Sequence, residues 1–262
     1  MRLPRRRAVL AWLGAAGAAG SWRVALGQSA ATVAAASDLQ FALEDVAAAF
    51  ERTTGQRLRL VFGSSGNFYA QLLQDAPFDL FLSADEDYVL RLADAGKTLD
   101  RGRLYALGRI ALVATRGSPL AVDPELKGLG VALREGRVQK FAIANPEHAP
   151  YGRRAEEALR HAGLWDAIGP RLVLGENVSQ AAQFAVSGGA QGGIVSLSLA
   201  LSPKLAPLAA FATIPEGWHA PLRQRMVLTK RASAAARAFY EHLAGPEAQG
   251  VLARHGFVLP RT

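Results

Sequence analysis

The 262-residue sequence contains no cysteine. The chain therefore forms no disulfide, and it lacks the acylated cysteine by which a lipoprotein is anchored. After residue 30 no apolar run approaches the roughly eighteen residues that a membrane-spanning helix needs. These two absences predict a chain without a membrane anchor.

The first 27 residues contain no acidic residue, but they hold five arginines. Arg6 and Arg7 stand just before thirteen uncharged, mostly apolar residues (8–20), and small residues follow. This order is typical of a secretory signal peptide, and its apolar run is too short to span a bilayer. We predict cleavage after residue 27, or as late as about residue 31, and export to the periplasm by the Sec or the twin-arginine route.

Removal of this segment also removes most of the excess positive charge. The whole chain has 30 basic and 22 acidic residues, a formal charge of +8. Without residues 1–27 the balance is 25 against 22, or +3. No basic patch interleaved with aromatic residues remains, so nucleic-acid binding is not expected. A mild positive charge is compatible with a small anionic ligand.

Short apolar runs alternate with amphipathic helical patterns along the mature chain. Predicted strands cover residues 32–36, 58–62, 78–84, 109–115, 140–146, 171–174, 192–199 and 225–229. Predicted helices cover residues 37–51, 67–74, 85–95, 152–163, 177–189, 233–244 and 246–254, with connections at 116–130 and 202–221. This alternation predicts an α/β fold with mostly parallel sheets flanked by helices.

Four strand-to-helix turns carry hydroxyl groups or helix-opening backbone N–H groups. In sheets of this kind ligands bind beyond the carboxyl ends of the strands, where such turns converge. The turns are "AAASDL" with Ser37, "FGSSGN" with Ser64 and Ser65, "NPEHAPYG" with Tyr151, and "GENVSQ" with Asn177 and Val178. Each turn alone is also typical of a helix cap or a packing residue. Together they predict a pocket for a small oxyanion that neutral hydrogen bonds hold.

Enzymatic chemistry finds little support in the sequence. The "GSSG" loop is not the G-x-S-x-G of hydrolases, and the five histidines form no pair with an acid at a fixed spacing. No H-E-x-x-H pair indicates zinc, and "GGAQGG" lacks the lysine of a phosphate loop. We expect no catalytic residue, cofactor or metal cation. A secreted α/β serine hydrolase that uses Ser65 remains the alternative from another class.

The combination of motifs resembles the periplasmic molybdate-binding proteins, the solute receptors of molybdate ABC transporters. The resembling segments are the four turns above together with "APFDLFLSAD" and "GGIVSLS", in the family's order, and "FYEHLAGPEAQGVLARHGF" near the end. They extend over nearly the whole mature chain. The resemblance implies a two-lobed periplasmic-binding-protein fold with two crossovers at the hinge. It places one lobe at about residues 30–112 with 224–262, and the other at 113–223.

The resemblance also implies which residues contact the anion. In that family a tetrahedral oxyanion is held by hydroxyl and backbone N–H groups from both lobes. The matching positions here are Ser37, Ser65, Tyr151 and Val178, the last through its backbone N–H. Ser196 stands where the family often has a tyrosine, and we expect Tyr151 to supply that hydroxyl instead. Ser64, Asn177 and Asp38 are further candidates from the same turns.

Asp38 bears on the choice of ligand. It follows Ser37, which with Gln40 forms an S-x-x-Q capping box, and we expect its carboxylate to face solvent. If it faced the pocket instead, it would repel a dianion or accept a proton from hydrogen phosphate. We predict a monomeric, non-enzymatic receptor for molybdate or tungstate that delivers it to an ABC permease. A receptor for sulfate or phosphate is the nearest alternative.

Overall fold

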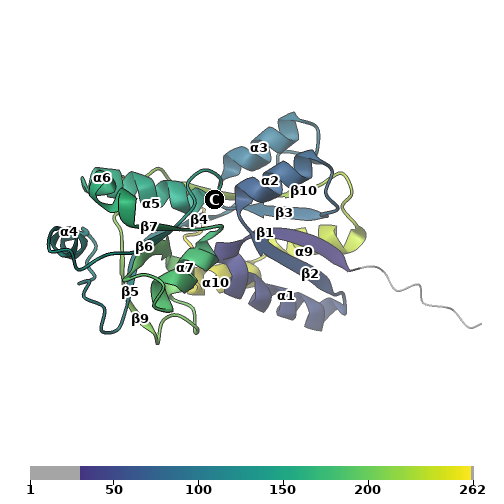
Figure 1. The fold of residues 1–262 in the computed structure, drawn as a ribbon. Helices are drawn as coiled ribbons and strands as arrows, with labels where there is room; N and C mark the ends of the chain where they lie inside the picture. The colour runs from purple at the N-terminus through teal and green to yellow at the C-terminus, as the bar shows by residue number, and fades with distance from the viewer. Residues whose placement is uncertain (1–29, 261–262) are drawn as a thin grey trace, which may run out of the picture.

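The computed structural model describes residues 30–260, and the predicted signal peptide lies outside them. Within this range the strands form two five-stranded sheets (Figure 1). The first sheet has the order β2-β1-β3-β10-β4 and consists of β1 (Ala31–Ala36), β2 (Leu58–Gly63), β3 (Leu80–Ser83), β4 (Arg103–Gly108) and β10 (Leu222–Leu228). The second has the order β7-β6-β8-β5-β9 and consists of β5 (Ile110–Thr115), β6 (Phe141–Ala144), β7 (Leu172–Gly175), β8 (Gly193–Ser196) and β9 (Ala209–Thr213).

Helices join most of these strands. They are α1 (Gln40–Thr54), α2 (Ser65–Leu73), α3 (Glu86–Asp94), α4 (Lys127–Arg134), α5 (Pro150–His161), α6 (Trp165–Ile168), α7 (Val178–Val186), α8 (Leu197–Ala200), α9 (Ala234–Ala244) and α10 (Pro246–Arg254). Three short 3-10 turns are η1 (Ser37–Leu39), η2 (Gly169–Arg171) and η3 (Glu216–Trp218). No helix among the described residues combines the length and the apolar character that crossing a bilayer requires.

The first sheet is covered by helices on both faces, because its strands are apolar at successive positions. Val33 and Ala35 pack with α1, α9 and α10 on one face, while Ala34 and Phe81 pack with α2 and α3 on the other. Strands β2, β1 and β3 run parallel, and β10 lies antiparallel between β3 and β4. A buried face on each side of a mostly parallel sheet is the arrangement that the alternating sequence pattern predicts.

The second sheet has a similar plan. Strand β6 pairs in parallel with β7 and β8, and β5 lies antiparallel between β8 and β9. Apolar side chains of α4, α5, α7 and α8 form one core with its strands. The two sheets with their helices form two lobes (Figure 1), which confirms the predicted α/β, two-lobed fold.

The described chain passes between the sheets twice, first between Gly108 and Ile110 and again between Thr213 and Leu222. The lobe boundaries inferred from the sequence, at 112/113 and 223/224, stay a prediction. We use "first lobe" for the part that carries the β2-β1-β3-β10-β4 sheet and "second lobe" for the other.

Two predicted connections contain regular structure. Residues 127–134 form α4, and residues 209–213 form β9. The pattern of α4 is interrupted by Gly128 and Gly130, which lower helix propensity, and the helix exists because Leu129 and Leu133 pack into the core of the second lobe. Strand β9 lies at a sheet edge with Phe211 partly exposed, so it lacks the buried apolar run of an inner strand.

The core of the first lobe should respond strongly to loss of Phe239. This ring is fully buried in α9 and contacts Phe50 edge to face, with 5.2 Å between centroids. We expect Phe239→Ala to lower the free energy of unfolding by about 3–5 kcal/mol, because the deletion leaves a cavity. Phe211→Ala, at a site 37% exposed, should cost far less. Equal losses in urea denaturation would contradict this description of the core.

Candidate functional site

A small cavity lies where the strand-to-helix turns of the two lobes meet. Its volume is only about 10 Å³. It is lined by Ala36, Ser37, Asp38, Gly63, Ser64, Ser65 and Ala84 of the first lobe and by Ala149, Pro150, Tyr151, Asn177 and Val178 of the second. The structure thus brings together every predicted site residue except Ser196.

In the first lobe Ser65 is placed to donate a hydrogen bond into the cavity. It is the first residue of α2 and is fully buried. Its Oγ accepts a hydrogen bond at 3.0 Å from the N–H of Ala84, the residue after β3. Because an accepting hydroxyl still has its own hydrogen, Ser65 can donate to a ligand oxygen.

In the second lobe the cavity faces two helix N-termini. Tyr151 lies in the first turn of α5, and Val178 is the first residue of α7. Asn177 caps α7, since its Oδ1 accepts from the N–H groups of Ser179 and Gln180. The N–H of Val178 has no acceptor among residues 30–260. With α2 from the first lobe, three helix N-termini surround the cavity, and such termini favour an anion.

Ser37 joins the lobes and does not form the predicted capping box. Ser37 is the first residue of η1, and α1 begins only at Gln40. Neither helix has a side-chain cap. The Ser37 Oγ accepts from the Ser179 N–H at 3.3 Å, and its carbonyl oxygen accepts from the Ser179 hydroxyl at 2.9 Å. The hydroxyl pairs with α7 because this turn faces the other lobe and not solvent.

The expectation that Asp38 faces solvent is wrong. The residue is 1% exposed, because η1 packs against α7 and α8 of the second lobe and its carboxyl meets Gln224 of β10. Its Oδ2 accepts from the Tyr151 hydroxyl at 2.8 Å and from Gln224 Nε2 at 2.7 Å. Its Oδ1 has no hydrogen-bond partner among the described residues. Burial raises the pKa of the carboxyl to about 6, although the bonds from Gln224 and Tyr151 oppose this shift.

Two tyrosines complete this buried group. Gln224 Nε2 also contacts the Tyr151 hydroxyl at 3.0 Å, and the Tyr105 hydroxyl donates to Gln224 Oε1 at 2.7 Å. Burial and the neighbouring Asp38 charge raise the pKa of both phenols well above the ordinary value, so both stay neutral. Gly108 permits this packing, since a Cβ there would overlap the Tyr151 hydroxyl.

Ser196 lies outside the cavity wall. It is fully buried, and its Oγ caps α8 by accepting from the Leu199 N–H at 3.3 Å. The neighbouring Ser198 hydroxyl donates to the Asp38 carbonyl oxygen at 2.8 Å. The Ser196 hydroxyl therefore serves the second lobe's own structure. That Tyr151 takes the place of the missing tyrosine stays a prediction.

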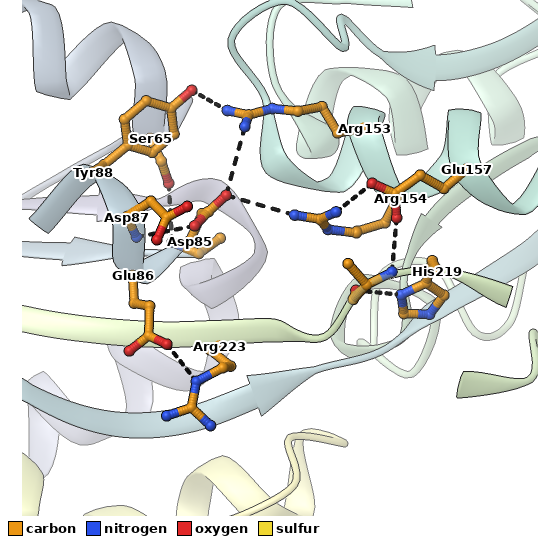
Figure 2. A network of polar contacts seen from close by, with 12 residues as sticks. Ser65, Asp85, Glu86, Asp87, Tyr88, Arg153, Arg154, Glu157, His219 and Arg223 are labelled. Carbon is orange, nitrogen blue, oxygen red and sulfur yellow. Dashed lines mark hydrogen bonds and ion pairs between the residues drawn. The ribbon is translucent and has the colours of Figure 1, made fainter. Parts of the chain in front are cut away.

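Ion pairs at the rim of the cavity link the lobes (Figure 2). Arg153 and Arg154 of α5 each have a guanidinium nitrogen 3.7 Å from Asp85 Oδ2 of the first lobe. Arg153 also donates to the Tyr88 hydroxyl, and Asn67 donates to Glu176 at 3.3 Å. These contacts require the lobes to be closed on each other, so the structure is that of a closed form.

The arrangement does not suit a serine hydrolase. No histidine contacts Ser65 among the described residues, but the neighbouring Ser64 Oγ lies 2.9 Å from His148 Nδ1. The Ser64 hydroxyl donates to the His148 carbonyl oxygen at 2.7 Å. Nδ1 then acts as the donor to Ser64, which is the reverse of what a general base does.

A larger cavity of about 580 Å³ lies between β4, β10 and residues 258–260. Its wall is mainly aliphatic. The two arginines in it are paired, Arg109 with Glu216 and Arg223 with Glu86. A mainly aliphatic wall whose arginines are already paired with carboxylates is a poor site for an oxyanion.

Sequence reasoning missed Gln224, Tyr105 and His148. A signal for Gln224 was present: Leu222, Gln224 and Met226 alternate with two arginines, and a polar residue in the buried phase of a strand needs a partner. Tyr105 and His148 have no comparable local signal, because their partners come from distant parts of the chain.

The fold and the site together are those of a two-lobed solute receptor with a small cavity between its lobes. The chain belongs to the bacterial extracellular solute-binding protein family, whose model matches residues 31–258. It is 34% identical over 230 residues to the molybdate-binding protein ModA of Azotobacter vinelandii, covering 87% of this chain and 89% of that one. It is 33% identical to ModA of Rhodobacter capsulatus, covering 82% of each.

A solved structure agrees with these matches. The periplasmic molybdate-binding protein of Azotobacter vinelandii superposes with a TM-score of 0.78 and 30% identity, over 88% of this chain and 100% of that one. The resemblance drawn from the sequence motifs is therefore confirmed.

Closure of the lobes should depend on Gly66. Its N–H donates to the His148 carbonyl oxygen of the other lobe at 3.0 Å, and a Cβ would stand 2.5 Å from that oxygen. We expect Gly66→Ala to weaken anion binding roughly 5- to 150-fold, from an overpacking cost of about 1–3 kcal/mol. The melting temperature without ligand should change little, because alanine favours the helix and the one close atom of the same lobe, the Tyr88 hydroxyl at 2.8 Å, is the end of a side chain that can shift.

The matched control is Gly250→Ala in α10, where a Cβ would meet only Arg254 Nη1 at 3.6 Å. Small-angle X-ray scattering, with molybdate, sulfate and phosphate added in turn, should show ligand-induced compaction in the control and less of it in Gly66→Ala. Full compaction with unchanged affinity in Gly66→Ala would show that Gly66 is not at a closing contact.

Proposed function

We propose that this protein is the receptor of an ABC transporter that binds molybdate, and tungstate as well, in the cavity between its lobes. The single observation that carries the proposal is the convergence of serine hydroxyls and helix N-termini from both lobes on one small cavity. The molybdate-binding names of relatives 33–34% identical over most of the chain support the choice of anion. Those names also support a binding protein over an enzyme.

The chemistry of the cavity wall suits such an anion. No lysine, arginine or histidine is among the lining residues. Molybdate and tungstate are fully deprotonated near pH 7, so they need donors only. A proton-bearing anion leaves its own proton unpaired unless an acceptor is present, at a cost of about 1–3 kcal/mol. Neutral donors and helix N-termini can hold a dianion without a cation.

The four principal residues have distinct parts in this proposal. Ser37 and Ser65 donate through their hydroxyls, and Val178 donates through its N–H at the start of α7. Tyr151 lines the same cavity, but its hydrogen is engaged by Asp38, so it acts with that residue. Ser64 and Asn177 have their side-chain oxygens occupied, which assigns them to holding the turns in place.

Closure of the lobes around the anion would distinguish the loaded receptor from the empty one. The rim contacts between α5 and Asp85 form only when the lobes meet, so a ligand that bridges the lobes favours the closed form. We propose that a membrane permease recognises this form, and that the receptor works as a monomer in the periplasm after removal of residues 1–27.

A second candidate ligand is hydrogen phosphate. The observation that favours it is the buried Asp38 carboxylate in the cavity wall, with Oδ1 unpartnered among the described residues. Such an oxygen can accept the proton that hydrogen phosphate carries. This candidate has no support from the names of the relatives above, and we place it second.

Thermal melting should separate these candidates. We expect molybdate and tungstate to raise the melting temperature by roughly 5–10 °C, because binding adds about 2.7 kcal/mol at 100 times the dissociation constant. Sulfate and phosphate at the same concentration should give a smaller shift. If only phosphate stabilises the protein, the second candidate replaces the first, and if no anion does, both are wrong.

Ser65→Ala should weaken molybdate binding without loss of the fold. The change removes one donor to the ligand and leaves the buried Ala84 N–H without its acceptor. Each lost bond costs about 1–3 kcal/mol, so we expect at least a fivefold rise in Kd and a melting temperature lower by a few degrees. Calorimetric titration measures the first and circular dichroism the second.

Ser187→Ala, at an exposed serine just after α7, is the matched control and should change neither quantity. An unchanged Kd in folded Ser65→Ala would remove Ser65 from the site.

A further inference from the structure

Asp38 presents the cavity with a carboxyl group whose two oxygens differ. Oδ2 accepts from Tyr151 at 2.8 Å and from Gln224 at 2.7 Å. Oδ1 is buried and has no hydrogen-bond partner within residues 30–260. A buried polar atom without a partner is uncommon, and Asp38 is one of the residues that line the cavity.

The neighbouring groups determine which oxygen carries a proton. Tyr105 donates to Gln224 Oε1 at 2.7 Å, which turns the Gln224 amide NH₂ toward Asp38. The Tyr151 hydroxyl receives from that NH₂ and gives its own hydrogen to Oδ2. With two donors already on Oδ2, the carboxylic acid form must hold its proton on Oδ1. It then becomes a neutral donor like the serines around it.

The side chains that face the Asp38 carboxyl carry no positive charge that would stabilise its ionised form. The side chains that bond its carboxyl are Gln224 of β10 and Tyr151 of α5, with Tyr105 of β4 bonded to Gln224 in turn, and all three are neutral. The backbone N–H groups of Asp38 and Leu39 also lower the pKa of this carboxyl, but burial outweighs them. The titratable His148 contacts another wall residue, Ser64. Within the described part of the chain, no arginine or lysine forms an ion pair with Asp38: Arg153 and Arg154 pair with Asp85, and Arg109 pairs with Glu216.

We propose that the pocket takes up its oxyanion together with one proton from solvent, which stays on Asp38 Oδ1 and forms a hydrogen bond to the bound anion. The proposal rests on the proposed function. It resolves the conflict between a dianion and a buried carboxylate, since an ionised Asp38 would repel the ligand at hydrogen-bonding distance. Asp38 is then a specificity residue whose protonated form belongs to the binding-competent pocket.

The proposal makes affinity depend on pH with a definite sign. Only the protonated pocket binds, so the apparent Kd rises about tenfold for each pH unit above the pKa of the ligand-free carboxyl. In the closed form burial raises the pKa of this carboxyl to about 6. Between pH 6 and pH 8 the Kd for molybdate should therefore rise at least tenfold, and roughly 50-fold if the pKa is 6. Below that pKa the dependence should level off.

The test is calorimetric titration of the mature protein with sodium molybdate at pH 6, 7 and 8, in buffers of different ionisation enthalpy. The buffer dependence of the heat counts the protons taken up. We expect close to one proton per anion at pH 8 and roughly half a proton at pH 6. Unchanged Kd between pH 6 and pH 8 with no proton uptake would overturn the inference, and this result needs only the unaltered chain.

Asp38→Asn assigns the proton to its residue. Asparagine can keep an oxygen toward Tyr151 and Gln224 and place its NH₂ where Oδ1 stands, so it imitates the protonated acid. We expect this variant to bind molybdate with the same Kd at pH 6 and pH 8, and without proton uptake. Glu44→Gln, an equal loss of charge at an exposed position of α1, should keep the dependence of the unaltered chain.

The outcomes separate this inference from the proposed function. If the unaltered chain binds no molybdate at any pH, the proposed function fails and the inference with it. If it binds with a pH-independent Kd, only the inference fails. If folded Asp38→Asn keeps the pH dependence of the unaltered chain, another group carries the proton and the assignment to Asp38 is wrong.

Discussion

The contact between the turn after β1 and the second lobe is the interaction on which the rest of the site depends. Ser37 meets the start of α7, and Asp38 meets Tyr151 of α5. Both sheets direct the carboxyl ends of their parallel strands toward this contact, so all four turns meet at one cavity. Without closure the hydroxyl and N–H groups of the two lobes would face water separately, and no enclosed pocket would exist.

The groups that line the pocket are hydroxyl and N–H donors, as at the N-terminus of a helix, and not the charged side chains of an ion-pair site. Three helix N-termini and the serine hydroxyls provide donors, and no cationic side chain lines the wall. The cations near the pocket are at its rim, where Arg153 and Arg154 pair with Asp85 across the lobes (Figure 2). Charge thus holds the lobes together, and neutral groups surround the cavity. The buried Asp38 is the exception, and its raised pKa shows the cost of ionising it there.

The sequence predicted the inner strands and the helices after the four turns to within a few residues, because their apolar periodicity and their small-residue turns are local signals. It missed the edge strands β4 and β9 and the glycine-bearing helix α4, which depend on packing against distant residues, and it extended the strand of β8 over residues that form α8. In the same way seven site residues were found from their turns, but the side chain of Asp38 was misplaced. Its partners Tyr151 and Gln224 lie 113 and 186 residues further along the chain, and no local rule contains them.

The most direct test of the central claim is a crystal structure of the mature protein with molybdate, with molybdenum located by its anomalous scattering. We expect one strong peak in the interlobe cavity, with anion oxygens within hydrogen-bonding distance of Ser37 Oγ, Ser65 Oγ and the Val178 N–H. A peak elsewhere, or closed lobes with molybdenum absent from the cavity, would contradict it.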